Sequence, residues 1–324
     1  MRSPSPSGRA PGCSINSAAI EAARPPRGTA ERDALRRAVL RTLVYADIFE
    51  YPLDRAEIHR YLVGYAASRE AVDEILDDDT VLRDDVECTD GLFHLRGRAG
   101  IVATRQVRAC AAARHWPVAR RWVGAIARLP LVRSVRVTGA LAMDNVDGDG
   151  DIDLFVLTQP GRLWICRLIV LVVVRIAALR GHRICPNFLL STDRLALTER
   201  NVFTAHEVAQ AIEISSGPWG AIFREANRWT DTYLPNAQEG RVAEARRSPP
   251  LVAQLVSHVL AAPLFDRLER WEMQRKIKRL ELRAQREGGS IAFSKDECRG
   301  HFAAHDVRVL AEYASRIARL EAMS

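Results

Sequence analysis

Two aspartates, Asp151 and Asp153, are the residues of this chain whose type and spacing point most directly to chemistry. They lie at the start of an apolar run, Ile152 to Thr158, that is typical of a β-strand. Because side chains alternate between the faces of a strand, the two carboxylates share one face, about 7 Å apart. Neighbouring carboxylates repel each other unless a cation lies between them. The pattern predicts a site for Mg²⁺, which takes oxygen ligands and completes its shell with water and substrate phosphates.

A phosphate-binding turn is expected just before these acids. The apolar strand predicted over Val132 to Val137 runs into Thr138-Gly139-Ala140. A glycine lets backbone N–H groups come close to a phosphate, especially where a short helix begins. The acids and the turn together therefore indicate a site for a metal and a phosphate-bearing ligand.

This stretch resembles the signature of the polymerase-beta-type nucleotidyltransferase superfamily. Gly139-Ala140 is followed by ten residues and then by the acid–apolar–acid–apolar sequence Asp151-Ile152-Asp153-Leu154. The resemblance is specific over Val132 to Thr158, and Ala140 departs from it because a small polar residue or glycine is usual there.

The resemblance implies an enzyme that transfers a nucleoside monophosphate from an NTP to an unknown hydroxyl-bearing acceptor, which is a protein, an RNA or a small molecule. Asp151 and Asp153 would be catalytic and would hold Mg²⁺ or Mn²⁺. Thr138, Gly139 and Ala140 would contact the triphosphate.

The resemblance also implies a third carboxylate, on a later strand that faces the acidic pair, which helps to deprotonate the attacking hydroxyl. The strand predicted over Arg183 to Leu190 offers Asn187, and Asp193 follows just beyond its end. An asparagine could ligate a metal through oxygen but could not act as a base. The alternative function is therefore a catalytically impaired nucleotide-binding or scaffold protein of the same fold.

A calcium-binding loop is the competing interpretation of the acids, because Asp147, Asp149, Asp151 and Asp153 alternate along the chain. An EF-hand loop needs glycine at its sixth position and an acid at its twelfth. A loop that starts at Asp147 would place Ile152 and Thr158 there, so the match fails.

The composition is that of a soluble globular protein with two or three domains: 324 residues, 48% hydrophobic and 27% charged. The net charge is +7, but the first 32 residues contain five Arg and two Glu, so the remainder is only mildly basic. Six scattered cysteines favour a reduced, cytoplasmic setting. The most apolar run, Leu163 to Leu179, is interrupted by Arg167 and Arg175 and is expected to be a buried crossover segment, so we expect no membrane partner.

The expected fold class is α+β, with a small mixed-sheet nucleotidyltransferase-like core. A winged-helix-like domain precedes the core and a helical region follows it. The predicted divisions are a disordered tail (1–32), the winged-helix-like domain (33–99), the nucleotidyltransferase-like domain (100–234), a linker or long loop (235–250) and the helical C-terminal region (251–324).

The winged-helix-like interpretation depends on three helices followed by a hairpin whose strands are expected at Val81 to Arg83 and Leu92 to Leu95. A second alternative function is accordingly a winged-helix DNA-binding regulator. The third helix disfavours sequence-specific DNA binding, because Arg69 to Asp79 contains one Arg and six acids, a net charge of −5.

Two further elements are expected beyond the core strands. Asn201 to Ile214 is predicted to form a helix that is capped by Thr204, with Glu207 at the capping-box position. His301 and His305 are spaced four apart on a predicted final helix, where an ordinary pair is favoured over a metal site.

Overall fold

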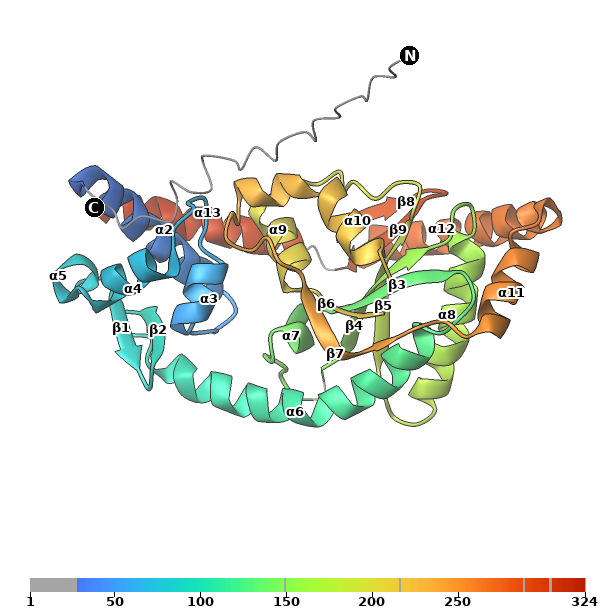
Figure 1. The fold of residues 1–324 in the computed structure, drawn as a ribbon, viewed down its shortest axis with the longest axis horizontal. Helices are drawn as coiled ribbons and strands as arrows, with labels where there is room; N and C mark the ends of the chain where they lie inside the picture. Colours follow the sequence, from blue (N-terminus) through green and yellow to red (C-terminus); the bar gives the residue numbers. More distant parts are fainter. Residues whose placement is uncertain (1–27, 149, 216, 288, 303–304, 324) are drawn as a thin grey trace, which may run out of the picture.

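The computed structural model describes residues 28–323 except 149, 216, 288, 303 and 304. The fold is α+β: a small helical module at one end and a mixed β-sheet at the other are joined by one long helix, α6 (Gly100–Ile126) (Figure 1). The last helix, α13 (His305–Met323), returns to lie against the first module. Of the predicted disordered tail, residues 1–27 lie outside the described residues, and a helix already begins at Thr29.

The first module consists of helices that pack on a short hairpin. Its elements are α2 (Thr29–Asp47), α3 (Arg55–Arg60), α4 (Arg69–Asp77), α5 (Asp79–Leu82), β1 (Val86–Thr89) and β2 (Leu92–Leu95). Asp54 caps α3 in a reciprocal capping box with Glu57. Leu35, Val39 and Ile75 are among the side chains of its buried core.

The hairpin differs from the expected one in its first strand. Val81 and Leu82 belong to α5, whose N-terminus is capped by the Asp78 carboxylate, so the strand begins only at Val86. Asp90 and Gly91 form the two-residue turn with φ of 53° and 77°, the left-handed values that a tight hairpin requires.

The main sheet has seven strands in the order β7-β6-β3-β4-β5-β9-β8. Their bounds are β3 (Val132–Thr138), β4 (Ile152–Thr158), β5 (Ile184–Ser191), β6 (Ile212–Ser215), β7 (Arg241–Arg247), β8 (Gly289–Phe293) and β9 (Glu297–Phe302). β4 pairs in parallel with β5 and β6 with β7, while the other neighbours are antiparallel. The sheet is therefore mixed, as predicted.

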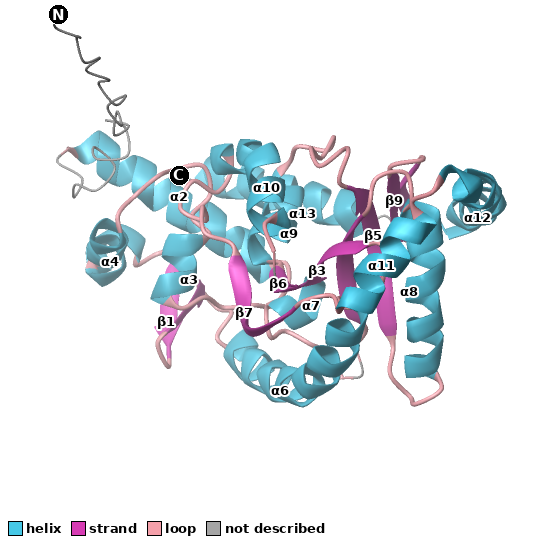
Figure 2. Cartoon of the chain, turned by 45° about the vertical axis from the view of Figure 1, so that its right-hand side comes forward, coloured by secondary structure: helices cyan, strands magenta, loops and turns pink. Residues whose placement is uncertain are grey.

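The crossover between the parallel strands β4 and β5 is α8 (Leu163–Ala178), at the apolar run where a buried crossover was expected. Its first turn is buried, whereas Val172 and Ile176 in its second half are exposed, so the prediction of burial is correct only in part. Among the described residues, no single helix is long and apolar enough to cross a membrane. Leu154 and Val156 of β4 belong to the same buried cluster as residues of α6 and α8, whereas Phe155 and Leu157 pack with α10 (Trp219–Ala226). Helix α8 lies against one face of the sheet (Figure 2). The alternation along β4 therefore places Asp153 on the opposite face, with Phe155.

Several predicted elements were wrong in the second half of the chain. The helix expected over Asn201 to Ile214 ends as α9 (Val202–Gln210), because Ile212–Ser215 joins the sheet as β6. Its N-cap is Asn201, whose side chain accepts the Thr204 N–H, so Thr204 is not the cap. Residues 241–247 of the expected linker form β7.

The region expected to be helical from residue 251 onward also contributes strands, β8 and β9, to the sheet. Its helices are α11 (Leu251–Leu260), α12 (Asp266–Glu287) and α13. His301 belongs to β9, and His305 is the first residue of α13, so the two histidines do not share a helix. Short helices α7 (Gly139–Ala142), η1 (Arg228–Thr232) and η2 (Pro263–Phe265) complete the described elements.

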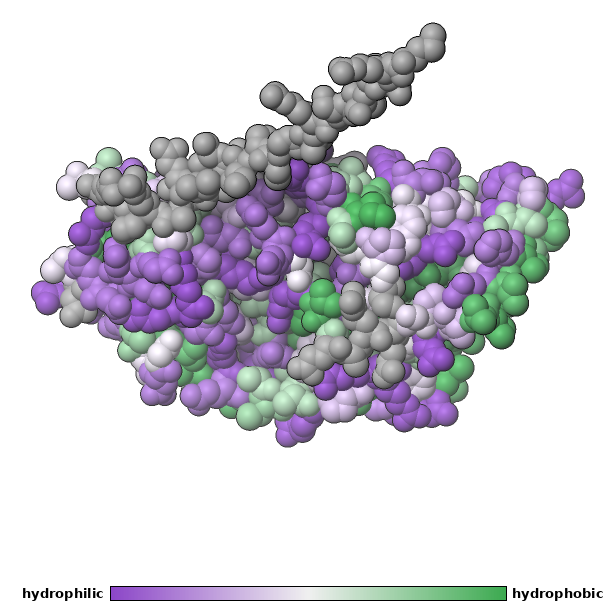
Figure 3. Space-filling view, viewed as in Figure 1, coloured by the Kyte–Doolittle hydropathy of each residue, from purple (hydrophilic) through white to green (hydrophobic). Residues whose placement is uncertain are grey.

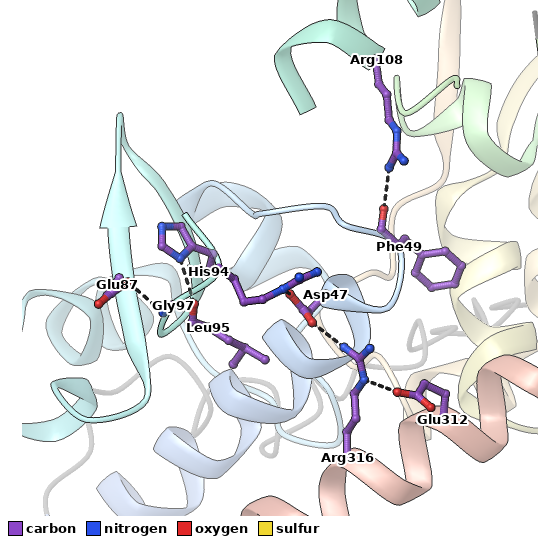
Figure 4. A network of polar contacts seen from close by, with 10 residues as sticks. Asp47, Phe49, Glu87, His94, Leu95, Gly97, Arg108, Glu312 and Arg316 are labelled. Carbon is purple, nitrogen blue, oxygen red and sulfur yellow. Dashed lines mark hydrogen bonds and ion pairs between the residues drawn. The ribbon is translucent and has the colours of Figure 1, made fainter. Parts of the chain in front are cut away.

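A buried carboxylate fastens α13 to the first module (Figure 4). Asp47, at the end of α2, accepts hydrogen bonds from Arg98 Nε at 2.7 Å and from Arg316 of α13. Arg316 also donates to Glu312 at 2.6 Å. Asp47 is only 6% exposed, so the two arginines compensate a charge that water cannot reach.

Replacing Asp47 should therefore loosen the contact between α13 and α2. We expect Asp47→Ala to lower the free energy of unfolding by roughly 2 kcal/mol, because two arginines lose a shared buried partner while remaining partly hydrated themselves. Urea denaturation followed by circular dichroism measures the loss. Glu321→Gln is the control, because it breaks only an exposed pair with Arg41 and should cost at most about 0.5 kcal/mol. Equal losses for both variants would contradict this role of Asp47.

Candidate active site

The site is built on a close approach between Gly139 and Asp153. Thr138, the last residue of β3, is paired with Asp153 of β4, so the chain turns into α7 directly beside this carboxylate. Gly139 has a φ of +64°, and a Cβ on it would lie 2.6 Å from Asp153 Oδ2. No other residue type fits this position without moving the acid.

Asp153 is held by the strand on its other side. Asn187 of β5 donates from Nδ2 to Asp153 Oδ1 at 2.5 Å, and its own Oδ1 accepts from the Cys185 thiol at 2.8 Å. Burial raises the pKa of Asp153 to about 6; the nearby charge of Asp151 adds to this effect and the Asn187 hydrogen bond opposes it. Asn187 thus occupies the facing position predicted for a third acid, but as a neutral donor.

Asp151 lies at the mouth of the same cavity. Its carboxylate is 43% exposed and accepts a hydrogen-bonded ion pair from Arg183 Nε at 2.7 Å. An ion pair between exposed groups stabilises a protein by only about 0–1 kcal/mol, so a ligand that binds Asp151 more strongly can replace Arg183. Both aspartates line the cavity as predicted, although Asp151 lies just before β4, which begins at Ile152.

The cavity has a volume of about 470 Å³ and is the place where most of the predicted site residues meet. They are Thr138, Gly139, Ala140, Asp151, Asp153 and Asn187. Asp193, the other candidate for the third acid, is exposed in the turn after β5 and is not part of the lining.

Glu207 is a cavity carboxylate that the sequence interpretation assigned to a helix cap. Because Asn201 caps α9, Glu207 is free to point into the cavity together with Thr204, Val208 and Ala211 of the same helix face. Burial, and to a smaller extent the charge of Asp153, raise the pKa of Glu207 to about 7. The available signal was that Glu207 is the one acid in α9, whose other residues are apolar or uncharged polar residues and one histidine.

Carboxylates outnumber cations in the cavity. Asp306, in the first turn of α13, is 6% exposed, and its Oδ1 has no hydrogen-bond partner among the described residues. Arg299 is the arginine in the described lining, and its guanidinium donates to both carboxylate oxygens of Glu199. The lining therefore has an excess of negative charge, which favours a divalent cation and disfavours a triphosphate without one.

The carboxylates of Asp151 and Asp153 are suited to Mg²⁺ or Mn²⁺ in a site where a bound ligand supplies some of the metal ligands. In the described part of the chain, no three His, Cys, Asp or Glu side chains converge to hold a metal by themselves. Mg²⁺ is commonly held by one or two carboxylates, with water and substrate phosphates as its other ligands. The donor set and the charge excess both agree with that kind of site.

A smaller compartment of about 120 Å³ opens next to the cavity, between the first module and α9. Both spaces are lined by Gly139, Ala140, Phe203, Glu207 and His305. Its outer wall is aromatic and consists of Tyr45, Phe49, Tyr51, Tyr61 and His206, of which Tyr45 and His206 stack with ring centroids 3.7 Å apart.

Comparisons with known proteins do not identify the chain, since no family model, no curated protein and no solved structure matches it.

The raised pKa of Glu207 makes stability depend on pH. The carboxyl group of Glu207 has a pKa of about 7 in the folded chain, against an ordinary value of 4.5. Its contribution to the free energy of unfolding is therefore complete below about pH 4.5 and is lost as the pH rises through 7. The substitution Glu207→Gln removes the charge of the side chain and keeps its size nearly unchanged. We expect its melting temperature to exceed that of the wild type by a few degrees at pH 8, with a smaller difference at pH 5.

Differential scanning calorimetry at the two pH values measures this effect. Asp193→Asn is the control, because this exposed residue lies outside the cavity, and its melting curves should follow the wild type at both values. A Glu207→Gln difference that is the same at pH 5 and pH 8 would show that Glu207 is not the buried titrating group.

Proposed function

We propose that this protein is a nucleotidyltransferase of the polymerase-beta type, which transfers a nucleoside monophosphate from an NTP to a hydroxyl-bearing acceptor and releases pyrophosphate. The observation that carries the proposal is the contact between Gly139 and Asp153. It places the side-chain-free turn at the start of α7 directly beside Asp153 of β4, and Asp151 immediately precedes that strand. A phosphate bound at the turn would therefore meet the metal ligands at once.

Asp151 and Asp153 would hold the metal ion, and Gly139 and Ala140 would leave room for the triphosphate. When bound, Mg²⁺ or Mn²⁺ supplies neutralisation of phosphate charge and alignment of the attack. Arg183 pairs with Asp151 at the same entrance, and it would donate to a phosphate oxygen once the metal ion binds Asp151.

Glu207 would take the role that Asn187 cannot fill. Asn187 has no proton-accepting carboxylate, whereas Glu207 has a pKa near 7 and lines both the cavity and the aromatic compartment. A group with this pKa is suited to accept a proton from an attacking hydroxyl at neutral pH. The acceptor hydroxyl would then approach from the aromatic compartment, on the far side of Glu207 from the triphosphate.

We further propose that the first module is winged-helix-like and serves as a wall of the acceptor site. Its helices, the β1–β2 hairpin and the Leu53–Phe93 bridge support the first part, and Tyr45 and Tyr61 in the compartment support the second. On α4, Asp73 and Asp77 share Arg55 from α3, so the acids of this helix still outnumber their basic partners and would repel a DNA backbone.

Transfer of label from NTPs that carry it on the α-phosphate tests the proposal. ATP, GTP, CTP and UTP are each incubated with Mg²⁺ and with protein, RNA and small-molecule acceptors. Asp153→Asn and Gly139→Ala should each lower the transfer rate by about 10²-fold or more, because the first removes a metal ligand and the second displaces it. Asp193→Asn is the matched control and should transfer at the wild-type rate. If the Asp153→Asn variant transfers label at the wild-type rate, the reaction does not take place at this site.

Glu207→Gln separates the base from the metal site. If Glu207 accepts the proton, the wild-type rate rises with pH around 7, and the variant loses this rise together with about 10²-fold or more of the rate. Calorimetric titration with Mg²⁺ and NTP should show binding in the variant that equals binding in the wild type. A variant with an unchanged pH profile would show that another group takes the proton.

Asn187 favours one alternative, a protein of this fold that binds nucleotide without turnover. The two cases differ in one experiment: calorimetric binding of Mg²⁺–NTP by the wild type, with no labelled product from any acceptor, supports the binding protein. Turnover that depends on Asp153 eliminates it.

A further inference from the structure

Helix α11 turns its apolar side away from the protein. Five side chains on one helix face are between 39 and 76% exposed: Leu251, Val252, Leu255, Val256 and Val259. Their spacing of one, three, one and three residues keeps them on a single stripe. A helix of a globular protein normally packs such a stripe against the core.

The opposite side of α11 holds the helix in place through small residues. Ala253 and Ser257 are buried, and Ser257 Oγ accepts the Leu131 N–H at 2.9 Å, just before β3 begins. These contacts fix the orientation of α11 on the protein. The larger apolar side chains on the opposite face of the helix are therefore exposed.

The stripe continues past the bend into η2 and α12. Leu264, Leu268 and Trp271 follow at intervals of four and three residues, and all are exposed. We define the apolar surface as these three residues and the five of α11. Figure 3 shows green at the right-hand edge of the molecule, where α11 lies.

The charges beside the apolar surface are mainly basic, because the three acids in the first two turns of α12 are each paired or hydrogen-bonded. Glu269 is buried and accepts the N–H groups of Trp164 and Ile165 at the start of α8. Glu272 is 1% exposed and pairs with Arg275, and Asp266 pairs with Arg162.

The basic residues of α12 remain on the outside. Arg267, Arg270, Lys278 and Arg279 are exposed, and Arg267 and Arg270 flank Leu268 and Trp271 directly. The apolar surface thus has a positively charged border with an indole at its edge.

We propose that the apolar surface docks this protein onto an anionic lipid bilayer, with α11 lying in the plane of the headgroups. Leucine and valine insert among acyl chains, basic side chains attract anionic headgroups, and tryptophan prefers the boundary between them. The earlier expectation of no membrane partner was based on Leu163 to Leu179, which is a different segment.

The docking is peripheral. Among the described helices only the bent pair Leu251–Leu260 and Pro263–Arg279, with an angle of 69°, has the combined length and composition of a span. Carrying this pair through a bilayer would pull Ser257 away from Leu131 and Glu269 away from the start of α8. Lying on the surface leaves all of these contacts intact.

A second copy of the chain fits the apolar surface less well. A two-fold contact pairs the patch with itself, and the eight residues of the apolar surface include no acid that could pair with Arg267 and Arg270 of the other copy. An anionic lipid surface supplies that negative charge.

Cosedimentation with vesicles tests the proposal on the full chain. The vesicles are phosphatidylcholine alone, or phosphatidylcholine with one quarter phosphatidylglycerol. We expect at least ten-fold more bound protein on the anionic vesicles, with a decrease at high salt. The double variant Leu255→Glu with Val259→Glu should abolish binding, and Arg267→Glu with Arg270→Glu should remove the preference for anionic vesicles.

The control is Val107→Glu, which places the same charge on an exposed valine of α6, away from the apolar surface. It should bind like the wild type, and circular dichroism should show the same melting curve for all variants because the altered side chains are exposed. Absent binding to anionic vesicles, or equal binding by the Leu255→Glu with Val259→Glu variant, would overturn the proposal. If light scattering without lipid shows that the wild type is a dimer and that the Leu255→Glu with Val259→Glu variant is a monomer, the surface would instead be assigned to a second copy of the chain.

Discussion

The organisation of the core follows from one steric constraint, the space that Asp153 takes from Gly139. The carboxylate lies where a side chain on residue 139 would be, so the chain can leave β3 only through a glycine with a left-handed backbone. That turn starts α7 and places Gly139 and Ala140 in the lining of the cavity. Asn187 holds the carboxylate from β5, and so three adjacent strands define the position of one acid.

Electrostatics then connects distant parts of the chain. Asp153 from β4, Glu207 from α9 and Asp306 from α13 line one cavity, and burial raises the pKa of the first two. A site with this excess of negative charge is unfavourable until a cation or a proton enters it. α13 can supply Asp306 because Asp47 and Arg316 fasten the helix to the first module, which also provides the aromatic wall of the adjoining compartment.

Local patterns predicted the centre of the fold well and its periphery poorly. The strand Ile152–Thr158, the crossover after it and the shared cavity of Asp151 and Asp153 depend on alternation and on flanking turns, which are visible in a short window. Ile212–Ser215 was predicted as the end of a helix because its identity as β6 depends on pairing with β3, some 75 residues away in sequence. Glu207 was missed because its role depends on which residue caps α9, and the β8–β9 hairpin depends on contact with β5.

The central claim is that Asp153, beside Gly139, binds a metal together with an NTP. The most direct measurement is the electron paramagnetic resonance signal of Mn²⁺ with a non-hydrolysable NTP analogue, because it requires no knowledge of the acceptor. The account predicts that the wild type and Asp193→Asn bind Mn²⁺ only when the analogue is present, and that Asp153→Asn binds none. Nucleotide-dependent Mn²⁺ binding that is unchanged in Asp153→Asn would contradict it.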